Sequence, residues 1–250
     1  MVKDDVRGTI MDVVRSELLR YMSGYSVLGV LAFAALVPWF IANFAGWPGN
    51  SEAVPPGYHI QAFWGLAASI AVVAAFAGSY VVSRESYYDT LRRTVLVSGL
   101  VAVAVAKYAA ALAIGSGIML TGIALWGASV AFAVPAAAHA ELLSPESWRF
   151  LPGVVLAGAM ASLWGCSLGW IIRHYYATTI VTMLLPLAVE LPLLLSFPEA
   201  ARWLPSGALA GVASLPLDGL LDPVPAFAVC SGWLAASGFA AAKVLEGTEF

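Results

Sequence analysis

The feature that most constrains the fold is the apolar run at residues 95–138, in which Lys107 is the one charged side chain. A membrane-spanning helix needs about 20 predominantly apolar residues, so this run is long enough for one tilted crossing or two short ones. Composition gives the class: 61% of the residues are hydrophobic, 11% are charged, and the mean hydropathy is +0.86. Because a soluble domain is only about 45 to 50% apolar, the sequence predicts an integral membrane protein.

The rest of the chain repeats this pattern, with apolar runs separated by short polar or proline-rich segments. The segment GWPGNSEAVPPGYH ends the first run, because repeated Pro and Gly prevent a helix from continuing. We expect a single all-α transmembrane domain over residues 1–250 with six spanning helices. Their expected ranges are 24–46, 60–82, 103–134, 151–173, 178–197 and 224–242.

Residues 1–23 are predicted to form an amphipathic helix that lies in the membrane surface. Its apolar side chains recur at helical spacing: Ile10, Val13, Val14, Leu18, Tyr21 and Met22. Its polar side chains fall mostly on the other side: Asp12, Arg15, Ser16 and Arg20. Such two-faced helices are typical of the membrane interface. The alternative is a polar start to a slightly extended first spanning helix.

The distribution of Lys and Arg distinguishes one crossing from two at residues 95–138, because these side chains collect on the cytoplasmic side. One crossing places most of them there: Lys3, Arg7, Arg15, Arg20, Arg84, Arg92, Arg93, Arg173 and Lys243. Arg149 and Arg202 are then outside, whereas two crossings would exchange them with Arg173 and Lys243. We therefore predict six crossings, with both termini in the cytoplasm.

Two glycine motifs predict where helices pack closely. Gly165 and Gly169 bound the sequence GCSLG, and Gly207 and Gly211 bound GALAG. Small residues four positions apart let helix backbones approach each other, so we expect both motifs to serve packing.

Several function classes are disfavoured by composition and motifs. The net charge of −3 argues against nucleic-acid binding, which needs clustered Lys and Arg. Cys166 and Cys230 lie in apolar runs and are interpreted as small apolar side chains, and the histidines have no metal-ligand spacing. Neither the pattern G-x-x-x-x-G-K-[ST] nor a recognisable nucleophile, base and acid set occurs in the sequence. We expect no enzymatic activity, no metal and no cofactor bound by this chain.

The segment SRESYYDTLRR at residues 83–93 separates two of the most apolar runs. Burying Arg or Asp at the bilayer centre costs about 2.5 to 3.5 kcal/mol each, so its five charges would together cost more than about 12 kcal/mol. The segment must therefore lie in the cytoplasm, and one interpretation is a loop that only orients the chain. The other is a short helix over residues 84–98 that docks on a partner. Its aromatic and apolar side chains, Tyr87, Tyr88 and Leu91, would then oppose the charged ones, Glu85, Asp89, Arg92 and Arg93.

The sequence RESYYDTLRRTVLVSGLVAVAVAKYAAAL resembles the second-crossing exit, coupling helix and third-crossing entry of ABC-2 type transporter permeases. In that family a glutamate is followed by a small residue and threonine, then Leu and Arg, and later an Ala-Lys pair. WIIRHYYATTIVTMLLPLAVELPLLL and ARWLPSGALAG resemble its fourth-to-fifth crossing turn and its outer helix-turn segment. The chain departs from the pattern at Asp89, where members often have Gly, and at residues 98–105, where Pro and Arg often precede Ala-Lys.

The resemblance implies the membrane subunit of a bacterial ABC exporter, with a connecting helix at the N-terminus, a coupling helix and an outer helix-turn segment. A separate cytoplasmic ATPase would bind ATP and Mg. A second permease subunit, identical or paralogous, would complete the pathway through the lipid bilayer of the cytoplasmic membrane for a hydrophobic drug, peptide or lipid. The residues implied in ATPase coupling are Glu85, Tyr88, Asp89, Thr90, Leu91, Arg92 and Arg93.

Two charges fall inside predicted spanning helices. The resemblance places Lys107 near the cytoplasmic face, so we begin the third crossing near Val103, where the ammonium can reach the lipid headgroups. Arg173 is expected at the same membrane edge. Glu190 is either a carboxylate of the pathway or dimer interface, or a structural one. Two other functions remain open: a secondary transporter that uses Glu190 and Lys107, and a non-transporting membrane immunity or interaction protein.

Overall fold

The computed structural model describes residues 2–45, 47, 57–134, 136–215 and 217–247, and every regular element among them is a helix. Most of the proline-rich segment after the first crossing, and the side chains of Lys3 and Arg7, lie outside the described part. Six helical segments are long and apolar enough to cross a membrane: Ser26–Phe44, Tyr58–Tyr87, Leu100–Ala133, Pro145–Ile172, Tyr175–Ser196 and Pro223–Glu246. The all-α class and the presence of six helical segments long and apolar enough to span are confirmed for the described residues, and they indicate a multi-pass membrane protein.

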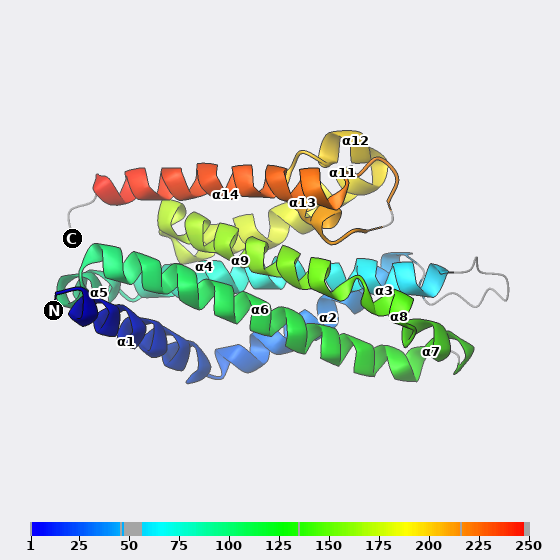
Figure 1. Ribbon diagram of the computed structural model, residues 1–250, viewed down its shortest axis with the longest axis horizontal. Coiled ribbons are helices and arrows are strands. Elements are labelled where there is room, and N and C mark those ends of the chain that lie inside the picture. Colours follow the sequence, from blue (N-terminus) through cyan, green and yellow to red (C-terminus); the bar gives the residue numbers. More distant parts are fainter. Residues whose placement is uncertain (1, 46, 48–56, 135, 216, 248–250) are drawn as a thin grey trace.

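Figure 1 shows the arrangement of the helices. Two further elements, η1 and η2, are π-helical. The bounds of all these elements are α1 Val2–Met22, α2 Ser26–Ala45, α3 Tyr58–Ala68, α4 Ile70–Tyr87, α5 Leu91–Ser98, α6 Leu100–Ala133, α7 Ala136–Leu142, α8 Pro145–Trp148, α9 Leu151–Ile172, α10 Tyr175–Thr179, η1 Ile180–Leu184, η2 Pro186–Glu190, α11 Leu191–Ser196, α12 Pro198–Ala201, α13 Pro205–Val212 and α14 Pro223–Glu246.

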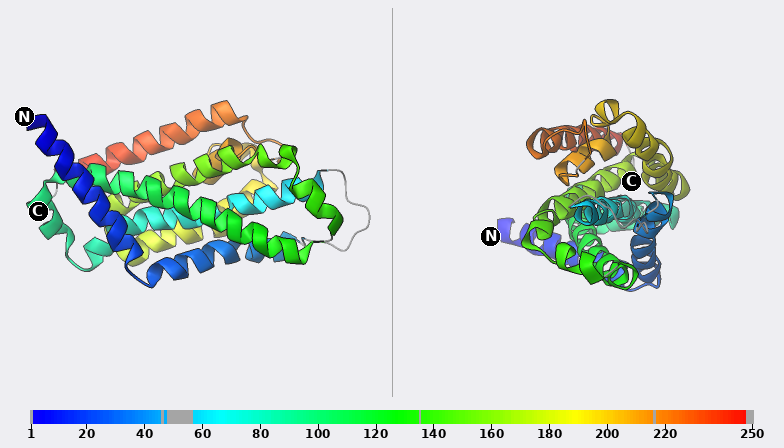
Figure 2. Two further views of the ribbon diagram at one scale, coloured as in Figure 1. Left: turned by 60° about the horizontal axis from the view of Figure 1, so that its bottom comes forward. Right: turned by 90° about the vertical axis from the view of Figure 1, so that its right-hand side faces the viewer.

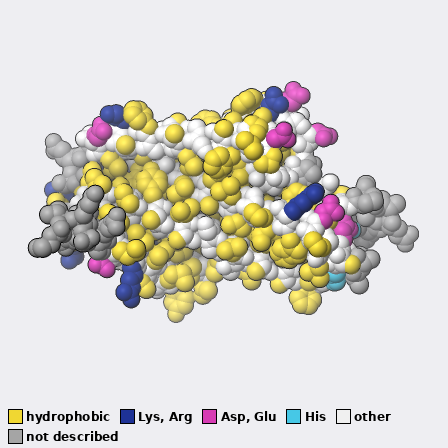
Figure 3. All heavy atoms as spheres, viewed as in Figure 1, with side chains coloured by type: hydrophobic (Ala, Val, Ile, Leu, Met, Phe, Trp, Pro, Cys, Tyr) yellow, Lys and Arg dark blue, Asp and Glu magenta, His cyan; other side chains and the backbone are white. Residues whose placement is uncertain are grey.

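The six candidate spanning segments run roughly side by side along the longest axis of the molecule, whereas α1 crosses one end of the bundle obliquely (Figures 1 and 2). The start of α1, the short helix α5 and the last turns of α14 lie at one end, which we call the α5 end. Helices α7, α8 and α12 lie at the other end, which we call the α8 end. On the face shown in Figure 3, hydrophobic side chains cover the middle and charged side chains gather toward the two ends. This distribution suits a bundle whose middle lies in hydrocarbon.

The long apolar run forms one continuous helix, α6, of 34 residues. The prediction of a single crossing is therefore confirmed, although the helix begins at Leu100 and not near Val103. Gly99 precedes it with φ 81° and ψ 144°, a conformation that glycine adopts readily and other residues rarely do. This glycine sets the angle between α5 and α6.

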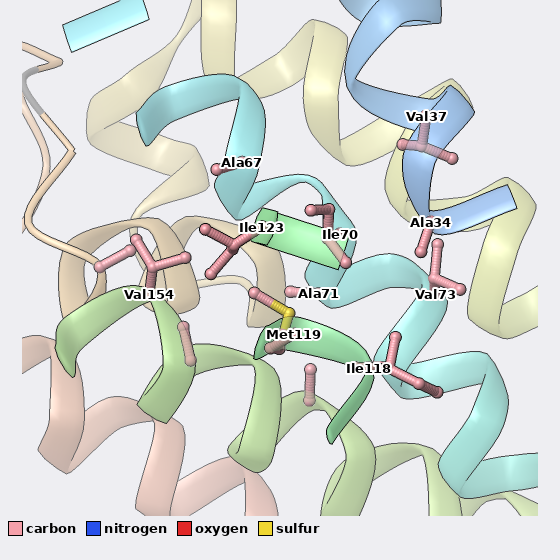
Figure 4. Packing of buried hydrophobic residues seen from close by; sticks show 14 of the residues in the cluster. Ala34, Val37, Ala67, Ile70, Ala71, Val73, Ile118, Met119, Ile123 and Val154 are labelled. Carbon is pink, nitrogen blue, oxygen red and sulfur yellow. The ribbon is translucent and has the colours of Figure 1, made fainter. Parts of the chain in front are cut away.

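The centre of the bundle is the contact between α4, α6 and α9, where small residues bring the backbones together. A Cβ built on Gly165 would overlap the carbonyl oxygen of Ala75, and one on Gly78 would overlap that of Ser162. The close approach predicted for GCSLG is thus confirmed. Larger side chains from α4, α6 and α9 fill the space around these contacts, including Ile70, Met119 and Val154 (Figure 4).

The fifth candidate span is irregular, because η1 and η2 are π-helical between α10 and α11. Pro186 and Pro192 have no backbone N–H and their rings clash with the carbonyl one turn earlier, so an ordinary α-helix is disfavoured at both. A π-helix has a longer hydrogen-bond spacing and is often found at functional sites. The backbone N–H of Leu191, for example, bonds to the carbonyl of Pro186. The second span is also interrupted, at Ser69 between α3 and α4.

Candidate functional site

The predicted helix over residues 84–98 is divided in the structure into the end of α4 and the separate helix α5. The chain turns at Asp89, whose φ is 54°, a left-handed conformation that Gly adopts without cost and that Asp tolerates better than most residues. The position therefore has the backbone geometry for which glycine is suited. Thr90 precedes α5 as its N-cap residue, although its side chain does not cap the helix.

The expected coupling residues lie close together at the α5 end, but they do not share one exposed face. Leu91 is buried with Val95 in a small core that includes Trp170, and Glu85 is only 3% exposed in the last turn of α4. Glu85 and Leu91 are therefore not on the surface that a partner could contact directly. The surface of this region is formed by the remaining coupling residues, which are exposed: Tyr88, Asp89, Thr90, Arg92 and Arg93.

Four charged side chains from three helices meet beneath α5, and we call them the ion cluster: Glu17 and Arg20 of α1, Glu85 of α4 and Lys107 of α6. The Nζ atom of Lys107 lies 3.1 Å from Glu17 Oε2 and 3.1 Å from Glu85 Oε2. It also donates a hydrogen bond of 2.8 Å to the carbonyl of Val81. Arg20 lies 3.2 Å from the other oxygen of Glu17 and pairs with the other oxygen of Glu85.

Burial makes the charge balance of the ion cluster important. Glu17 and Glu85 are buried, Lys107 is 0% exposed and Arg20 is 42% exposed. A buried charge without a partner is costly, whereas two carboxylates and two cations in contact leave no net charge. One oxygen of the Glu85 carboxylate pairs with Arg20 and the other with Lys107, so both oxygens face a cation.

The expectation that Lys107 reaches the lipid headgroups is wrong, because its ammonium is enclosed by α1, α4 and α6. The physical reason is neutralisation: with Glu17 and Glu85 beside it, the charge does not need headgroups or water. The sequence prediction places the start of the third crossing near Val103, because a start there leaves the Lys107 ammonium close to the membrane surface. With that constraint removed, α6 can begin at Leu100.

Glu17 is the member of the ion cluster that the sequence did not identify. It lies one turn from Val13 and one turn from Tyr21, and all three are buried against the bundle. A lone acid in the middle of an apolar helix stripe was the signal that could have identified it. Burial also raises the pKa of the Tyr21 phenol, so this face of α1 carries no tyrosinate. The other polar residues assigned to the opposite face of α1 are exposed: Asp12, Arg15, Ser16 and Arg20.

A group of tyrosine rings connects the end of α4 to the start of the fifth span. The ring of Tyr87 lies 5.7 Å from that of Tyr175 and 5.8 Å from that of Tyr176, measured between centroids. Tyr80 contacts Tyr175 at 6.0 Å and Tyr21 of α1 at 6.2 Å. These contacts join α1, α4 and α10 on the side of the bundle next to the ion cluster.

The remaining predicted site residues have structural surroundings. Arg173 ends α9 with φ 54° and is half-buried at the turn into α10. The carboxylate of Glu190 is buried, and its Oε2 accepts a hydrogen bond of 2.8 Å from the backbone N–H of Ser206 in the first turn of α13. This contact ties the fifth span to α13, so the geometry favours the structural interpretation of Glu190. Among the described residues, no group of three His, Cys, Asp or Glu side chains is placed to hold a metal.

Comparison with known sequences adds no assignment. No protein-family model and no curated protein matches this chain. The functional interpretation therefore depends on the ion cluster, on the exposed residues around α5 and on the arrangement of the six spans.

Proposed function

We propose that the chain is the membrane permease subunit of an ATP-driven ABC-2 type exporter in the bacterial cytoplasmic membrane. A separate cytoplasmic ATPase would supply ATP binding and hydrolysis, with Mg, because this sequence has no phosphate-binding motif. Two permease subunits, identical or paralogous, would enclose the pathway. Its cargo is a hydrophobic or amphiphilic drug, peptide or lipid.

The single observation that supports this proposal most strongly is the ion cluster directly beneath α5. Glu85 precedes the Asp89 turn, so a displacement of α5 acts on a residue that is bound to α1 and α6 at once. Buried ion pairs are broken only at a cost of about 3 to 5 kcal/mol, which makes the three helices move together. In this proposal, Tyr88, Arg92 and Arg93 contact the ATPase, and Glu85 transmits its movement.

The positions of the basic residues support an orientation with both termini in the cytoplasm. Arg84, Arg92, Arg93, Arg173 and Lys243 belong to helix ends at the α5 end. Arg149 and Arg202 lie beside α8 and α12 at the opposite end. By the positive-inside rule the α5 end faces the cytoplasm, where an ATPase could reach it. In this orientation α1 corresponds to the connecting helix and α13 to the outer helix-turn segment.

The unequal burial of the spans supports a second permease subunit. In an 18-residue apolar stretch of the span Tyr58–Tyr87, 67% of the residues are buried inside the chain. The corresponding share is 28% for Tyr175–Ser196 and 22% for Pro223–Glu246. These two spans and α2 offer broad apolar faces to lipid or to another subunit. Membrane helices associate through close packing of such faces, so a partner permease is accommodated without new polar contacts.

The test is co-expression with the neighbouring genes, which this proposal expects to include an ATPase with the pattern G-x-x-x-x-G-K-[ST], followed by purification through a tag on this chain. We expect the two proteins to co-purify and to show substrate-dependent ATP hydrolysis in lipid vesicles. Replacing both exposed arginines, Arg92→Glu and Arg93→Glu, should uncouple hydrolysis from transport while the protein still inserts. Arg149→Glu, a charge reversal at the α8 end, is the matched control and should retain coupling. Absence of a co-purifying ATPase, or equal coupling in both variants, would refute the proposal.

The other functions have weaker support from the geometry. Lys107 is held by Glu17 and Glu85, and Glu190 by Ser206, so both charges proposed for ion coupling have fixed partners. Secondary transport would require proton-driven flux without an ATPase and its loss in Glu190→Gln. An immunity or interaction protein would bind a partner without any flux.

A further inference from the structure

A cavity of about 120 Å³ lies within the bundle, between the second, fourth and fifth spans and α13. It lies beside the two irregular places in these spans: the break at Ser69 between α3 and α4, and the π-helical turn at Pro186. Helices with irregular backbones cannot pack flush over their whole length, which explains why space remains there. Two small residues, Gly65 of the second span and Ala161 of the fourth, are among the residues that line this space.

The walls of the cavity are hydrophobic, and among the described residues no charged side chain lines it. Two serines and the tryptophan Trp164, which carries an indole N–H, are the lining residues with polar side-chain groups. The hydroxyl of Ser69 donates a hydrogen bond to the carbonyl of Leu66, and the backbone N–H of Ser206 is bound to Glu190. A polar ligand would lose hydrogen bonds to water and regain few here, at a cost of about 1 to 3 kcal/mol per group. The chemistry of the walls therefore selects hydrocarbon.

We propose that this cavity is a binding site for a segment of a bilayer lipid acyl chain. An apolar cavity of about 150 Å³ stays dry and takes a small hydrocarbon such as benzene, so about 120 Å³ suits a short stretch of chain. The residues around it belong to membrane-spanning segments, where the surrounding solvent is itself hydrocarbon. The site is independent of the proposed transport function and of any ATPase.

Trp164 lines the cavity and reports on what fills it. The purified protein is placed in vesicles of phosphatidylcholine brominated in the middle of its chains, since bromine quenches tryptophan fluorescence on contact. Subtracting the signal of Trp164→Phe isolates this one indole. We expect Trp164 to be quenched by the brominated chains and protected from the water-soluble quencher iodide. Because the vesicles contain no other ligand, the quenching group can come only from lipid.

A cavity-filling variant distinguishes chains inside the cavity from lipid around the protein. A Cβ built on Gly65 meets no atom within 4 Å, and Gly65 lines the cavity, so Gly65→Leu adds side-chain volume at the cavity wall. We expect this variant to lose most of the Trp164 quenching. Gly232→Leu is the matched control, because Gly232 also has open space but lies on the exposed side of α14 and should leave quenching unchanged.

Each alternative outcome overturns the proposal. If brominated chains do not quench Trp164 in the wild-type protein, no acyl chain occupies the cavity. This result does not depend on the Gly65→Leu variant. Quenching by iodide shows a wet cavity. Equal quenching in Gly65→Leu and the wild-type protein assigns the bromine to surrounding lipid.

Discussion

Removing Lys107 from the ion cluster tests whether these charges hold α1 to the bundle. The ammonium lies 3.1 Å from an oxygen of Glu17 and 3.1 Å from an oxygen of Glu85. At an effective dielectric constant of about 20, each attraction is about 5 kcal/mol, and much of it offsets the desolvation of the three groups. Lys107→Met removes both attractions and leaves two buried carboxylates facing Arg20 alone. We expect the free energy of unfolding to fall by about 3 to 5 kcal/mol.

A second substitution separates charge from packing. Glu17→Gln alone leaves an excess cation, and we expect a loss similar to that of Lys107→Met. The double variant, with both Glu17→Gln and Lys107→Met, leaves Glu85 and Arg20 as a neutral pair. Its loss in the free energy of unfolding should therefore be smaller than the sum of the losses of the two single variants. The difference measures the coupling energy between Glu17 and Lys107.

The assay is denaturant unfolding of the purified protein in detergent micelles, followed by tryptophan fluorescence. Lys243→Met is the control, because Lys243 forms an exposed ion pair with Glu246 at 2.7 Å and should lose less than about 1 kcal/mol. The proposal that the ion cluster holds α1 to the bundle is refuted if Lys107→Met is no more destabilising than Lys243→Met. Strict additivity in the double variant would also contradict it.

Substitutions at Gly165, Asp89 and Glu190 test the packing, the backbone and a buried hydrogen bond. Gly165→Val should destabilise the protein by about 3 kcal/mol or prevent folding, because its Cβ would overlap a carbonyl of α4. Gly232→Val is the control, because a Cβ there has open space. Monodispersity and unfolding midpoints of the two variants are compared. At the left-handed turn, Asp89→Gly should keep or raise stability by up to about 1 kcal/mol and Asp89→Val should lower it, as measured by denaturant midpoint. Glu190→Gln keeps an acceptor for Ser206 and should be nearly neutral, whereas Glu190→Leu should lose about 1 to 3 kcal/mol and speed hydrogen exchange of the Ser206 amide.

The sequence predicted some parts of the candidate site well. The cost of burying charge removed residues 83–93 from the membrane, and in the structure Arg92 and Arg93 are exposed at one end of the bundle. The same physics did not reveal that Glu85 is a buried member of an ion pair. Its partner Lys107 lies on another helix, and Glu17 is 90 positions away from Lys107 in the chain. Local patterns carry no information on contacts between residues so far apart.

What the sequence by itself determined is the class of the protein, the six segments apolar enough to span a membrane and a single long helix within residues 95–138. The class and the six segments follow from length and hydrophobicity, and the single helix is indicated by the distribution of Lys and Arg. Only the tertiary structure decided where α6 begins and what Lys107 contacts, because both depend on whether a charge finds partners inside the bundle. Folding brought Glu17, Glu85 and Lys107 together, and their mutual neutralisation allows an ammonium to be buried where the sequence predicted that it would reach toward water.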